Sequence, residues 1–281
     1  MIKKLTVVLV LSLSTIVGFA QEAQVGKAFY DTRVVNGQSV EMSNEGVMKF
    51  IIGHRFGTLN SGPYQLFGLD NSTIRLGFDY GIKKWLNVGI GRSSFEKTYD
   101  GFVKLRLLKQ GQKSTHKPLT LVYYSNIAYR TLKPRPNDVP VYTVNNLFYT
   151  HQLLAARKLN DRLSVQLMPT LVHRNLIEDQ KFKNDVLAMG AAFRYVVTKK
   201  FTISSEYYYV LPNQINPVFT NSLALGFNIE TKGHVFQLQV GNSRGMTEKF
   251  FVTETLGEVS KGDLFFGFNI TRDFKLKGRA Y

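Results

Sequence analysis

The residues best suited to bind a ligand in this sequence are basic side chains that alternate with apolar ones. Lys104 and Arg106 alternate with Val103, Leu105 and Leu107 in the stretch VKLRL. A two-residue period is that of a β-strand, so the two bases are expected on the opposite face from the apolar side chains. A face that carries ammonium and guanidinium groups in a row is suited to anions.

The same parity places seven bases and two acids on one face of the predicted strands. The bases are Lys49, Arg55, Arg75, Lys104, Arg106, Arg130 and Arg194, and the acids are Asp79 and Glu206. If this face lines a lumen, its excess of positive charge favours small anions. The alternative is a packed lumen in which bases and acids pair and close the bore.

A second group of charged residues brackets the tip of a predicted outer loop: Arg92, Glu96, Lys97 and Asp100. This group is interpreted either as a site for a ligand or partner, or as a solvated loop whose charges pair with one another. The second interpretation is favoured, because exposed ion pairs are common and contribute little.

Three apolar residues, Tyr64, Phe67 and Leu69, fall in the first predicted outer loop. Apolar side chains are unusual at an exposed loop tip. They are expected either to fold over the mouth of the barrel or to form a contact patch.

No arrangement in the sequence predicts an active site. A lipid hydrolase needs a serine and a histidine within hydrogen-bond reach of each other. His54 and Ser125 share the apolar parity, but the first and fifth predicted strands, which carry them, are not neighbours. None of the five histidines lies at metal-ligand spacing with another, and the chain contains no cysteine. The prediction is a protein that is not an enzyme, with no catalytic residue, no metal and no cofactor.

Twelve segments of the chain alternate with a two-residue period, which predicts an all-β protein. These segments are 46–56, 74–81, 86–91, 98–108, 118–130, 142–154, 162–172, 187–197, 201–210, 222–229, 236–241 and 264–271. Long connections such as 57–70 and 242–262 alternate with tight ones such as 160–161 and 199–200. This asymmetry is typical of a closed antiparallel up-and-down transmembrane β-barrel with its short turns in the periplasm. A backbone in lipid has no outside hydrogen-bond partner, so the sheet has to close.

The alternative architecture is a soluble periplasmic β-barrel, in which the apolar parity would face inwards. Glycines on the polar parity, such as Gly77, Gly190 and Gly226, favour the membrane barrel. They suit the crowded interior of a small barrel and would make a poor soluble surface.

The first residues of the chain indicate export. Residues 1–20 combine two lysines, an uncharged run and a small-residue cleavage site, as in a signal peptide. The prediction divides the chain into a signal peptide (1–20), an N-terminal segment suited to plug the lumen (21–45) and the barrel (46–281). Removal of the signal peptide lowers the net charge from +16 to +14. In an exported protein this charge fits an acidic polysaccharide or an anionic membrane surface better than nucleic acid.

Three stretches carry a family resemblance: TRVVNGQSVE at 32–41, HRFGTLNSGPYQLFGLD at 54–70 and GIGRSSFEKTYDGF at 89–102. They resemble a family of Gram-negative outer-membrane β-barrels of unknown function. The resemblance implies the fold and a place in the outer membrane, and it transfers no catalytic residue. The stretch LFFGFNITRDF at 264–274 is similar to the last strand that the outer-membrane assembly machinery recognises. Outer-membrane lipid and that machinery are therefore the expected partners.

The functional prediction is a non-enzymatic outer-membrane barrel, either a narrow basic-lined pore for small anionic solutes or a scaffold that presents its loops. A lipid hydrolase of the outer membrane and a soluble ligand-binding barrel of the periplasm remain as alternatives. Neither nucleic acid nor a cofactor is expected as a partner. The sequence leaves open which solute is involved and whether the lumen is open or plugged.

Overall fold

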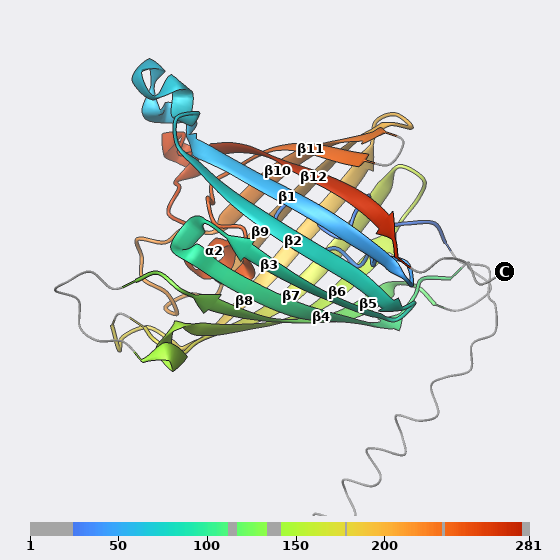
Figure 1. Cartoon of the computed structure of the whole chain (residues 1–281), viewed down its shortest axis with the longest axis horizontal. Coiled ribbons are helices and arrows are strands. Elements are labelled where there is room, and N and C mark those ends of the chain that lie inside the picture. Colours follow the sequence, from blue (N-terminus) through green and yellow to red (C-terminus); the bar gives the residue numbers. More distant parts are fainter. Residues whose placement is uncertain (1–24, 112–116, 134–141, 178, 232–233, 277–281) are drawn as a thin grey trace, which may run out of the picture.

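Within the residues that it describes, the computed structural model closes twelve antiparallel strands into a barrel (Figure 1). The described residues are 25–111, 117–133, 142–177, 179–231 and 234–276, so the predicted signal peptide (1–20) lies outside them. Each strand pairs with its neighbours in sequence, and β1 (Val47–Thr58) also pairs with β12 (Phe265–Lys275). The predicted fold, a closed up-and-down barrel of about twelve strands, is confirmed.

The remaining strands are β2 (Ser72–Lys83), β3 (Leu86–Ser93), β4 (Thr98–Leu108), β5 (Thr120–Arg130), β6 (Leu147–Lys158), β7 (Leu163–Arg174), β8 (Asp185–Val196), β9 (Phe201–Val210), β10 (Ser222–Thr231) and β11 (His234–Gly241). The helical elements are η1 (Leu59–Ser61), η2 (Pro63–Gly68), η3 (Phe95–Lys97), η5 (Thr143–Asn146), α2 (Glu248–Thr253) and η6 (Val259–Lys261). In the described part of the chain, no helix has the length and apolar character needed to cross a membrane.

The polar parity of each strand faces the lumen and the apolar parity faces outwards. In β2, Ile74, Leu76 and Phe78 are exposed on the outer face, whereas Arg75 and Asp79 are buried on the inner face. An apolar outer face is the one that lipid requires. Closure of the sheet pairs the backbone groups of every strand and leaves no open edge in the membrane.

One strand departs clearly from its predicted position, because β6 begins at Leu147 rather than at residue 142. The residues before it form the 3-10 turn η5. β6 also runs further than predicted, up to a turn that Asn160 closes. The Asn160 side-chain oxygen accepts hydrogen bonds from the amides of Arg162 and Leu163, both at 2.8 Å. Such local side-chain bonds set the limits of a strand, and apolar alternation does not reveal them.

The connections differ at the two ends of the barrel. One end, called the loop end here, carries long connections that include 59–71, 131–146 and 242–264. The other, the turn end, carries short connections such as 84–85 and 159–162. In bacterial membrane barrels the long connections lie outside the cell and the short turns lie in the periplasm.

Two segments outside the strands fill the lumen: the N-terminal segment, residues 25–45, and the inward loop, residues 242–257. Figure 1 shows α2, which belongs to the inward loop, inside the outline of the strands. All six α2 residues are buried, and α2 contacts β6, β7 and β9. Phe29 and Val35 of the N-terminal segment, Tyr208 of the wall and Phe251 of the inward loop belong to one apolar cluster. The core of this protein therefore lies inside the barrel.

Candidate functional site

The N-terminal segment enters the lumen from the turn end and folds back on itself. It begins beside the turn that follows β4, where the Val25 amide lies 3.4 Å from the Gln110 carbonyl oxygen. The Ser39 amide donates to the Thr32 carbonyl oxygen at 3.1 Å, which joins the two arms of a hairpin. The tip is residues 34–37, Val-Val-Asn-Gly, and the Asn-Gly pair suits a tight turn. Both arms of the hairpin therefore lie side by side in the lumen.

The hairpin tip wraps its backbone amides around the carboxylate of Glu206, a wall residue that is only 1% exposed. The Val35 and Asn36 amides donate to this carboxylate at 3.1 and 2.8 Å, and the Gly37 amide donates to both of its oxygens, at 3.1 and 3.0 Å. Successive amides that converge in this way form an anion-binding nest. A Cβ atom at position 37 would collide with the Tyr208 hydroxyl, so the close approach requires glycine.

Arg55 and Asn269 of the wall hold the other side of the tip. The Arg55 guanidinium donates to the side-chain oxygens of Asn36 at 2.8 Å and Asn269 at 3.0 Å. The Asn269 amide group in turn donates to the Val35 carbonyl oxygen at 3.0 Å. The tip is thus bonded to β1, β9 and β12 at once.

Wall glutamines bind the main chain of the hairpin arms. Gln166 accepts a hydrogen bond from the Val40 amide at 2.9 Å and donates to the Gln38 carbonyl oxygen at 2.7 Å. Gln237 donates to the Val34 carbonyl oxygen at 2.6 Å. These bonds do not depend on the side chain of the hairpin residue, except that proline at position 40 would lack the donating amide.

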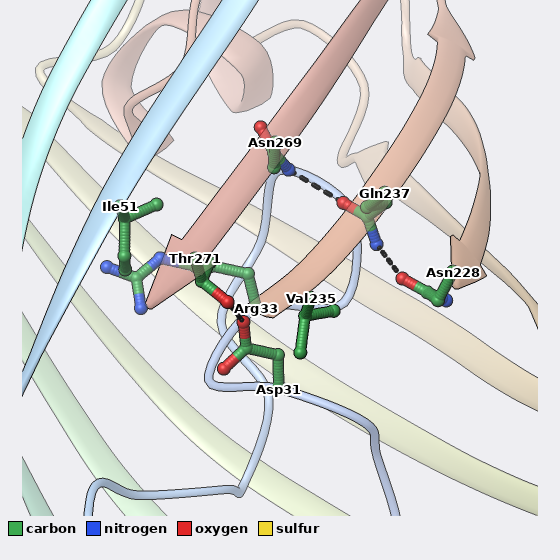
Figure 2. A pocket seen from close by; sticks show the side chains of 8 residues that line it. All are labelled: Asp31, Arg33, Ile51, Asn228, Val235, Gln237, Asn269 and Thr271. Atoms are coloured by element: carbon green, nitrogen blue, oxygen red, sulfur yellow. Dashed lines mark hydrogen bonds between the residues drawn. The ribbon is translucent and has the colours of Figure 1, made fainter. Parts of the chain in front are cut away.

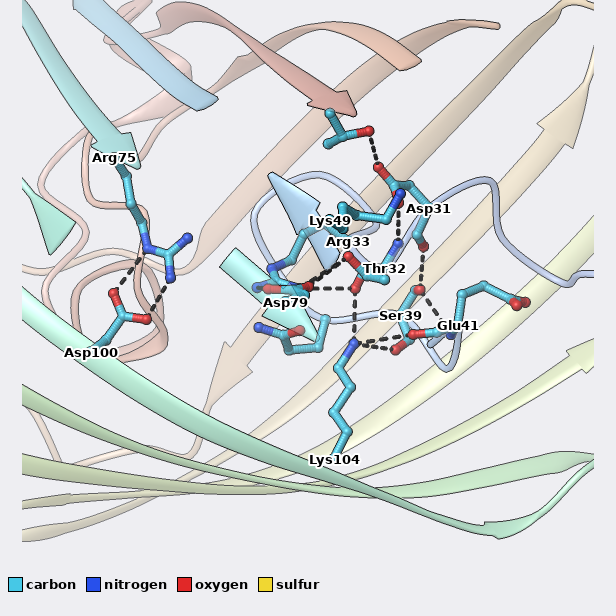
Figure 3. A network of polar contacts seen from close by, with 12 residues as sticks. Asp31, Thr32, Arg33, Ser39, Glu41, Lys49, Arg75, Asp79, Asp100 and Lys104 are labelled. Carbon is cyan, nitrogen blue, oxygen red and sulfur yellow. Dashed lines mark hydrogen bonds and ion pairs between the residues drawn. The ribbon is translucent and has the colours of Figure 1, made fainter. Parts of the chain in front are cut away.

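Lys104 lies under the middle of the hairpin and is 1% exposed. Its ammonium donates to the carbonyl oxygens of Thr32 at 3.0 Å, Ser39 at 3.1 Å and Glu41 at 3.3 Å (Figure 3). All three acceptors belong to the N-terminal segment. Lys104, predicted to face the lumen, therefore has its ammonium hydrogen-bonded to peptide carbonyls.

Asp31 of the N-terminal segment binds two wall residues (Figure 3). The Lys49 ammonium lies 2.9 Å from Oδ1, and the Thr271 hydroxyl donates to Oδ2 at 2.7 Å. Burial alone would raise the pKa of the Asp31 carboxyl. The positive charge of Lys49 and the hydrogen bond from Thr271 act in the opposite direction, and the pKa is lowered from its ordinary value. Asp31 is therefore a carboxylate in the closed lumen.

Arg33 makes the second ion pair between the N-terminal segment and the wall. Its guanidinium lies 2.9 Å from Asp79 Oδ2, and the Thr32 hydroxyl donates to the same oxygen at 2.9 Å. Burial lowers the pKa of Arg33, but the charge of Asp79 more than offsets it, so the pKa is raised. The two ion pairs have opposite polarity, with an acid of the wall in one and a base of the wall in the other.

The inward loop meets the hairpin inside the lumen. Gln38 donates to the Glu248 carboxylate of α2 at 3.0 Å. The ring of Phe251, also in α2, packs on Tyr208 with 5.3 Å between ring centroids. A segment that enters from the turn end thus touches a loop that enters from the loop end, and together they close the lumen.

Lys249 fixes α2 against the wall. Its ammonium lies 4.3 Å from the ring centroids of both Phe148 and Phe250 and forms an ion pair with Glu254 at 2.5 Å. Burial lowers the pKa of Lys249, and the charge of Glu254 offsets only part of that effect. Two aromatic faces and one carboxylate are therefore the groups that stabilise this charge.

A cavity between the hairpin and the wall is too small for a solute. Figure 2 shows one cavity there, lined by Asp31, Arg33, Ile51, Asn228, Val235, Gln237, Asn269 and Thr271. Its volume is about 10 Å³, which accommodates roughly one water molecule. Asn269 donates to Gln237 and Gln237 to Asn228, both at 2.6 Å, so the polar groups of the lining already have partners.

The seven bases predicted for the lumen wall all lie on the inner parity. Lys49, Arg55, Arg75 and Lys104 are buried. The other three are half-buried near strand ends and donate to the Lys84 carbonyl oxygen (Arg106), the Glu96 carboxylate (Arg130) and the Ala28 carbonyl oxygen (Arg194). The two predicted acids, Asp79 and Glu206, are each 1% exposed and both bind the N-terminal segment.

Asp100 does not belong to the outer-loop group in which it was predicted. It lies in β4, is 7% exposed and pairs with Arg75, with 2.9 Å between Arg75 Nε and Asp100 Oδ1. The reason is parity, because Asp100 shares the inner face of β4 with Lys104. The sequence contained that signal, since the two residues are separated by an even number of positions.

The remaining outer-loop residues do not gather into one site. Arg92 and Lys97 are exposed, and the Arg92 guanidinium lies 5.6 Å from the ring centroid of Tyr99. Glu96 pairs with Arg130 at 3.1 Å. The polar residues that do gather around the hairpin, such as Gln166, Gln237 and Asn269, were missed because uncharged amides on the inner parity look like ordinary lumen lining.

The structure places a serine and a histidine side by side on the outer face, in a pair that the sequence did not suggest. Ser125 of β5 lies directly opposite His151 of β6. The His151 Nδ1 atom, however, hydrogen-bonds the Tyr123 hydroxyl at 2.8 Å. His54 of β1 stacks on Phe268 instead. Among the described residues, no group of three histidine, aspartate or glutamate side chains is arranged to hold a metal ion.

The comparison with protein families matches residues 29–274 to the family described as "Membrane bound beta barrel domain (DUF5777)". The match runs from the hairpin through the first eleven strands and covers β12 except its last residue. The chain belongs to this family. Its outward apolar face is therefore a membrane-bound face, which agrees with the barrel geometry. The comparison with curated proteins found no match.

Several solved structures are similar to this membrane-bound barrel in fold. The NanC porin has a TM-score of 0.51 at 10% identity and covers 81% of this chain and 100% of its own. The KdgM porin has a TM-score of 0.49 at 11% identity, covering 80% of this chain and 99% of its own. An outer-membrane channel from Pseudomonas putida F1 has a TM-score of 0.48 at 12% identity, covering 89% of this chain and 100% of its own. At these identities the likeness to NanC shows the barrel fold alone.

Proposed function

We propose that this protein is a non-enzymatic channel of the outer membrane, exported by its signal peptide. In this proposal the N-terminal segment holds the channel closed, and small anionic solutes pass when the segment leaves. The observation that carries the proposal is the environment of Lys104. All three acceptors of its buried ammonium are carbonyl oxygens of the N-terminal segment, so a base of the wall is satisfied by a part that can move away.

The wall keeps a positive balance without the N-terminal segment. Asp100 adds a third buried acid to the predicted pair, and Arg174 is a fifth buried base beside Lys49, Arg55, Arg75 and Lys104, so five buried bases face three buried acids on the inner face of the described strands. Arg75 and Asp100 neutralise each other. Lys104 and Arg194 lose carbonyl partners when the segment leaves, which makes them the bases that a solute meets. A lumen lined in this way favours anions.

The contact between the N-terminal segment and the wall suits reversible release. Its ionic and hydrogen-bonded groups are rehydrated when the segment leaves, and a hydrogen bond exchanged for water contributes only about 0.5–1.5 kcal/mol. The burial of the larger apolar side chains of the segment opposes release, at roughly 1.5–3 kcal/mol for each of Phe29, Val34, Val35, Val40 and Met42. A permanently sealed barrel would gain as much from apolar packing without burying ions.

The test is a conductance measurement on the full mature chain in planar bilayers. Gly37→Ala places a methyl group against the Tyr208 hydroxyl and should expel the hairpin tip without changing any wall residue or charge. The matched control is Gly26→Ala in the same segment, where a Cβ atom would lie at an ordinary 3.8 Å from Lys158. Wild type and Gly26→Ala are expected to be silent or to open rarely. Gly37→Ala is expected to open at least tenfold more often, with anions carrying most of the current.

Release of the segment is measured separately, by the rate at which an added protease cleaves residues 25–45 in the folded barrel. Cation preference in Gly37→Ala would overturn the basic-wall argument. The channel proposal would be overturned if the Gly37→Ala barrel is silent in bilayers although its N-terminal segment is cleaved rapidly.

The first outer loop supports a second candidate function, a scaffold that presents its loops. Tyr64 is 96% exposed, and Leu66 and Phe67 are more than half exposed. Leu66 and Phe67 have φ values of 45° and 53°, a conformation that residues other than glycine rarely adopt. The loop thus holds apolar side chains outwards at some conformational cost. Silent bilayers for Gly37→Ala, together with a cell-surface cross-link lost in Tyr64→Ser, would favour the scaffold.

A further inference from the structure

We infer that the lumen is a binding site for short acidic peptides, and that the N-terminal segment is its built-in occupant. The inference rests on the proposed function, because a peptide can enter only when the segment leaves. It specifies the anionic solute as a peptide chain with an acidic side chain.

The first argument is that the wall binds the main chain of the occupant. Six wall side chains make hydrogen bonds to main-chain groups of the N-terminal segment: Lys104, Gln166, Arg194, Glu206, Gln237 and Asn269. Together they bind four backbone amides and eight backbone carbonyl oxygens of residues 27–41. Bonds to the main chain are the common basis of peptide binding that tolerates many sequences.

The donors and acceptors come from opposite parts of the barrel. Gln166 is on β7 and Gln237 on β11, whereas Lys104 is on β4. A sheet edge could read only one side of a peptide. The closed wall surrounds the occupant and binds amides and carbonyls from several directions. Inorganic oxyanions without protons have no donors, and sugar hydroxyls lack the fixed spacing of one N–H and one C=O per residue that a peptide main chain presents to this set of side chains.

The second argument is that the wall also holds an acidic side chain. Lys49 and the Thr271 hydroxyl grip the Asp31 carboxylate at 2.9 and 2.7 Å, and the Lys49 and Thr271 side chains come from the adjacent strands β1 and β12. Asp273 also pairs with Lys49, at 2.7 Å, but its side chain is 54% exposed and is screened by water. Figure 3 shows the Asp31 and Lys104 contacts at two neighbouring residues of the hairpin. A peptide with one acidic residue in an extended main chain could therefore bind Lys49 and Thr271 through its carboxylate and Lys104 through its carbonyl oxygens.

The third argument is that the lumen is wide enough for a peptide. The lumen holds both arms of the hairpin, joined by the Ser39–Thr32 hydrogen bond and by the pairing of Arg33 with Gln38. A single extended peptide occupies about half of that cross-section. Gly226 provides further space, because the Val35 side chain lies where a Cβ atom at position 226 would be in tight contact, at 3.1 Å.

The test measures binding of a fluorescent synthetic peptide with the sequence of residues 25–45 to the full chain in detergent. We expect the peptide to bind the Gly37→Ala chain, whose own segment is displaced, at least tenfold more tightly than the wild-type chain. A peptide N-methylated at the Val35, Asn36 and Val40 amides should lose most of its binding. A peptide with Asp31→Asn should bind several-fold more weakly, and an unrelated acidic peptide of the same length should still compete.

Two wall variants of the Gly37→Ala chain complete the experiment. Gln166→Leu removes two main-chain contacts and should weaken binding about tenfold, since each hydrogen bond contributes a few-fold. The matched control is Gln152→Leu, also a buried wall glutamine, whose hydrogen bonds go to the wall residues Thr170 and Tyr208. It should bind like its parent.

Equal binding to Gly37→Ala and wild type, or equal binding of the N-methylated peptide, would overturn the inference. Its failure is distinct from failure of the channel. If the peptide never blocks the anion current, the peptide site is wrong and the channel proposal is supported. If the peptide binds tightly to a barrel that never conducts, the channel proposal is wrong and the peptide site is supported.

Discussion

The backbone amide of Gly37 donates hydrogen bonds to both carboxylate oxygens of Glu206, at 3.1 and 3.0 Å, across 169 residues of sequence. One residue is at the tip of a hairpin and the other is in the middle of a wall strand. The Val35 and Asn36 amides complete the nest. This single carboxylate is therefore the anchor of the hairpin tip.

Replacing the anchor should loosen the hairpin and leave the barrel intact. Glu206→Gln turns one acceptor oxygen into an amide NH2 donor that faces the donating backbone amides, so the tip should lose about 2–3 kcal/mol of binding free energy. We expect protease cleavage of residues 25–45 to accelerate ten- to a hundredfold. Glu45→Gln, which removes the charge from an exposed pair with Lys83, should leave the rate unchanged. An unchanged rate in Glu206→Gln would show that the nest does not hold the tip.

A disulfide should lock the hairpin in the lumen. A sulfur at the position of Val35 Cγ2 would lie 3.1 Å from a Cβ atom at position 226, which is compatible with disulfide geometry. The chain has no cysteine, so Val35→Cys with Gly226→Cys gives one unambiguous bond. We expect the oxidised protein to be silent in bilayers under every condition and to regain wild-type openings on reduction. Either single variant serves as the control. Openings in the fully oxidised protein would contradict the proposal that the hairpin must leave.

Acid should release the N-terminal segment through Asp31. Its pKa is lowered from the ordinary value of 3.8 when it is bound to Lys49 and Thr271. A lowered pKa means that the bound state favours the carboxylate. The resulting stabilisation is fully present above the ordinary pKa and is lost as the pH falls through the lowered value. We expect the opening frequency to rise below about pH 4. In Asp31→Asn it should already be higher at neutral pH, and the part of the acid response that belongs to Asp31 should be absent. An identical pH profile in both proteins would exclude this carboxylate.

The inward loop should act as a second barrier. A Cβ atom at Gly245 would collide with the Cβ atom of Phe250, so Gly245→Ala should displace α2 from its site. We expect Gly37→Ala with Gly245→Ala to conduct more per opening than Gly37→Ala alone. Gly101→Ala, where a Cβ atom meets nothing closer than 3.8 Å, is the control for an added methyl group. Equal conductance in the two opened variants would mean that α2 leaves together with the hairpin.

The Arg75–Asp100 pair should matter to the barrel itself. Arg75→Met leaves the buried Asp100 carboxylate without its partner and should cost about 3–5 kcal/mol of the free energy of unfolding. Arg75→Met with Asp100→Asn should recover much of that loss, because no buried charge remains unpaired. The measurement is the urea concentration at which the compact band on an unheated gel disappears. A double variant as unstable as Arg75→Met would contradict the assignment of the cost to the unpaired carboxylate.

The amino-acid sequence by itself determined the wall. Side chains of a strand alternate between its two faces, so the parity of Lys104 against Val103 and Leu105 fixed which face meets lipid before any contact was known. The same rule placed Arg75 and Asp79 inside. Strand limits were less certain where a local bond decides them, as Asn160 does after β6.

Only the tertiary structure decided what fills the lumen. The hairpin binds through contacts such as Val35–Glu206 and Asp31–Thr271, which join residues 171 and 240 positions apart. Such contacts leave no periodic trace, because a loop inside a closed barrel can meet any strand. The alternation of the strands predicts that Lys104 and Glu206 face inwards. Their hydrogen-bond partners depend on how the closed wall and the folded hairpin fit together in space.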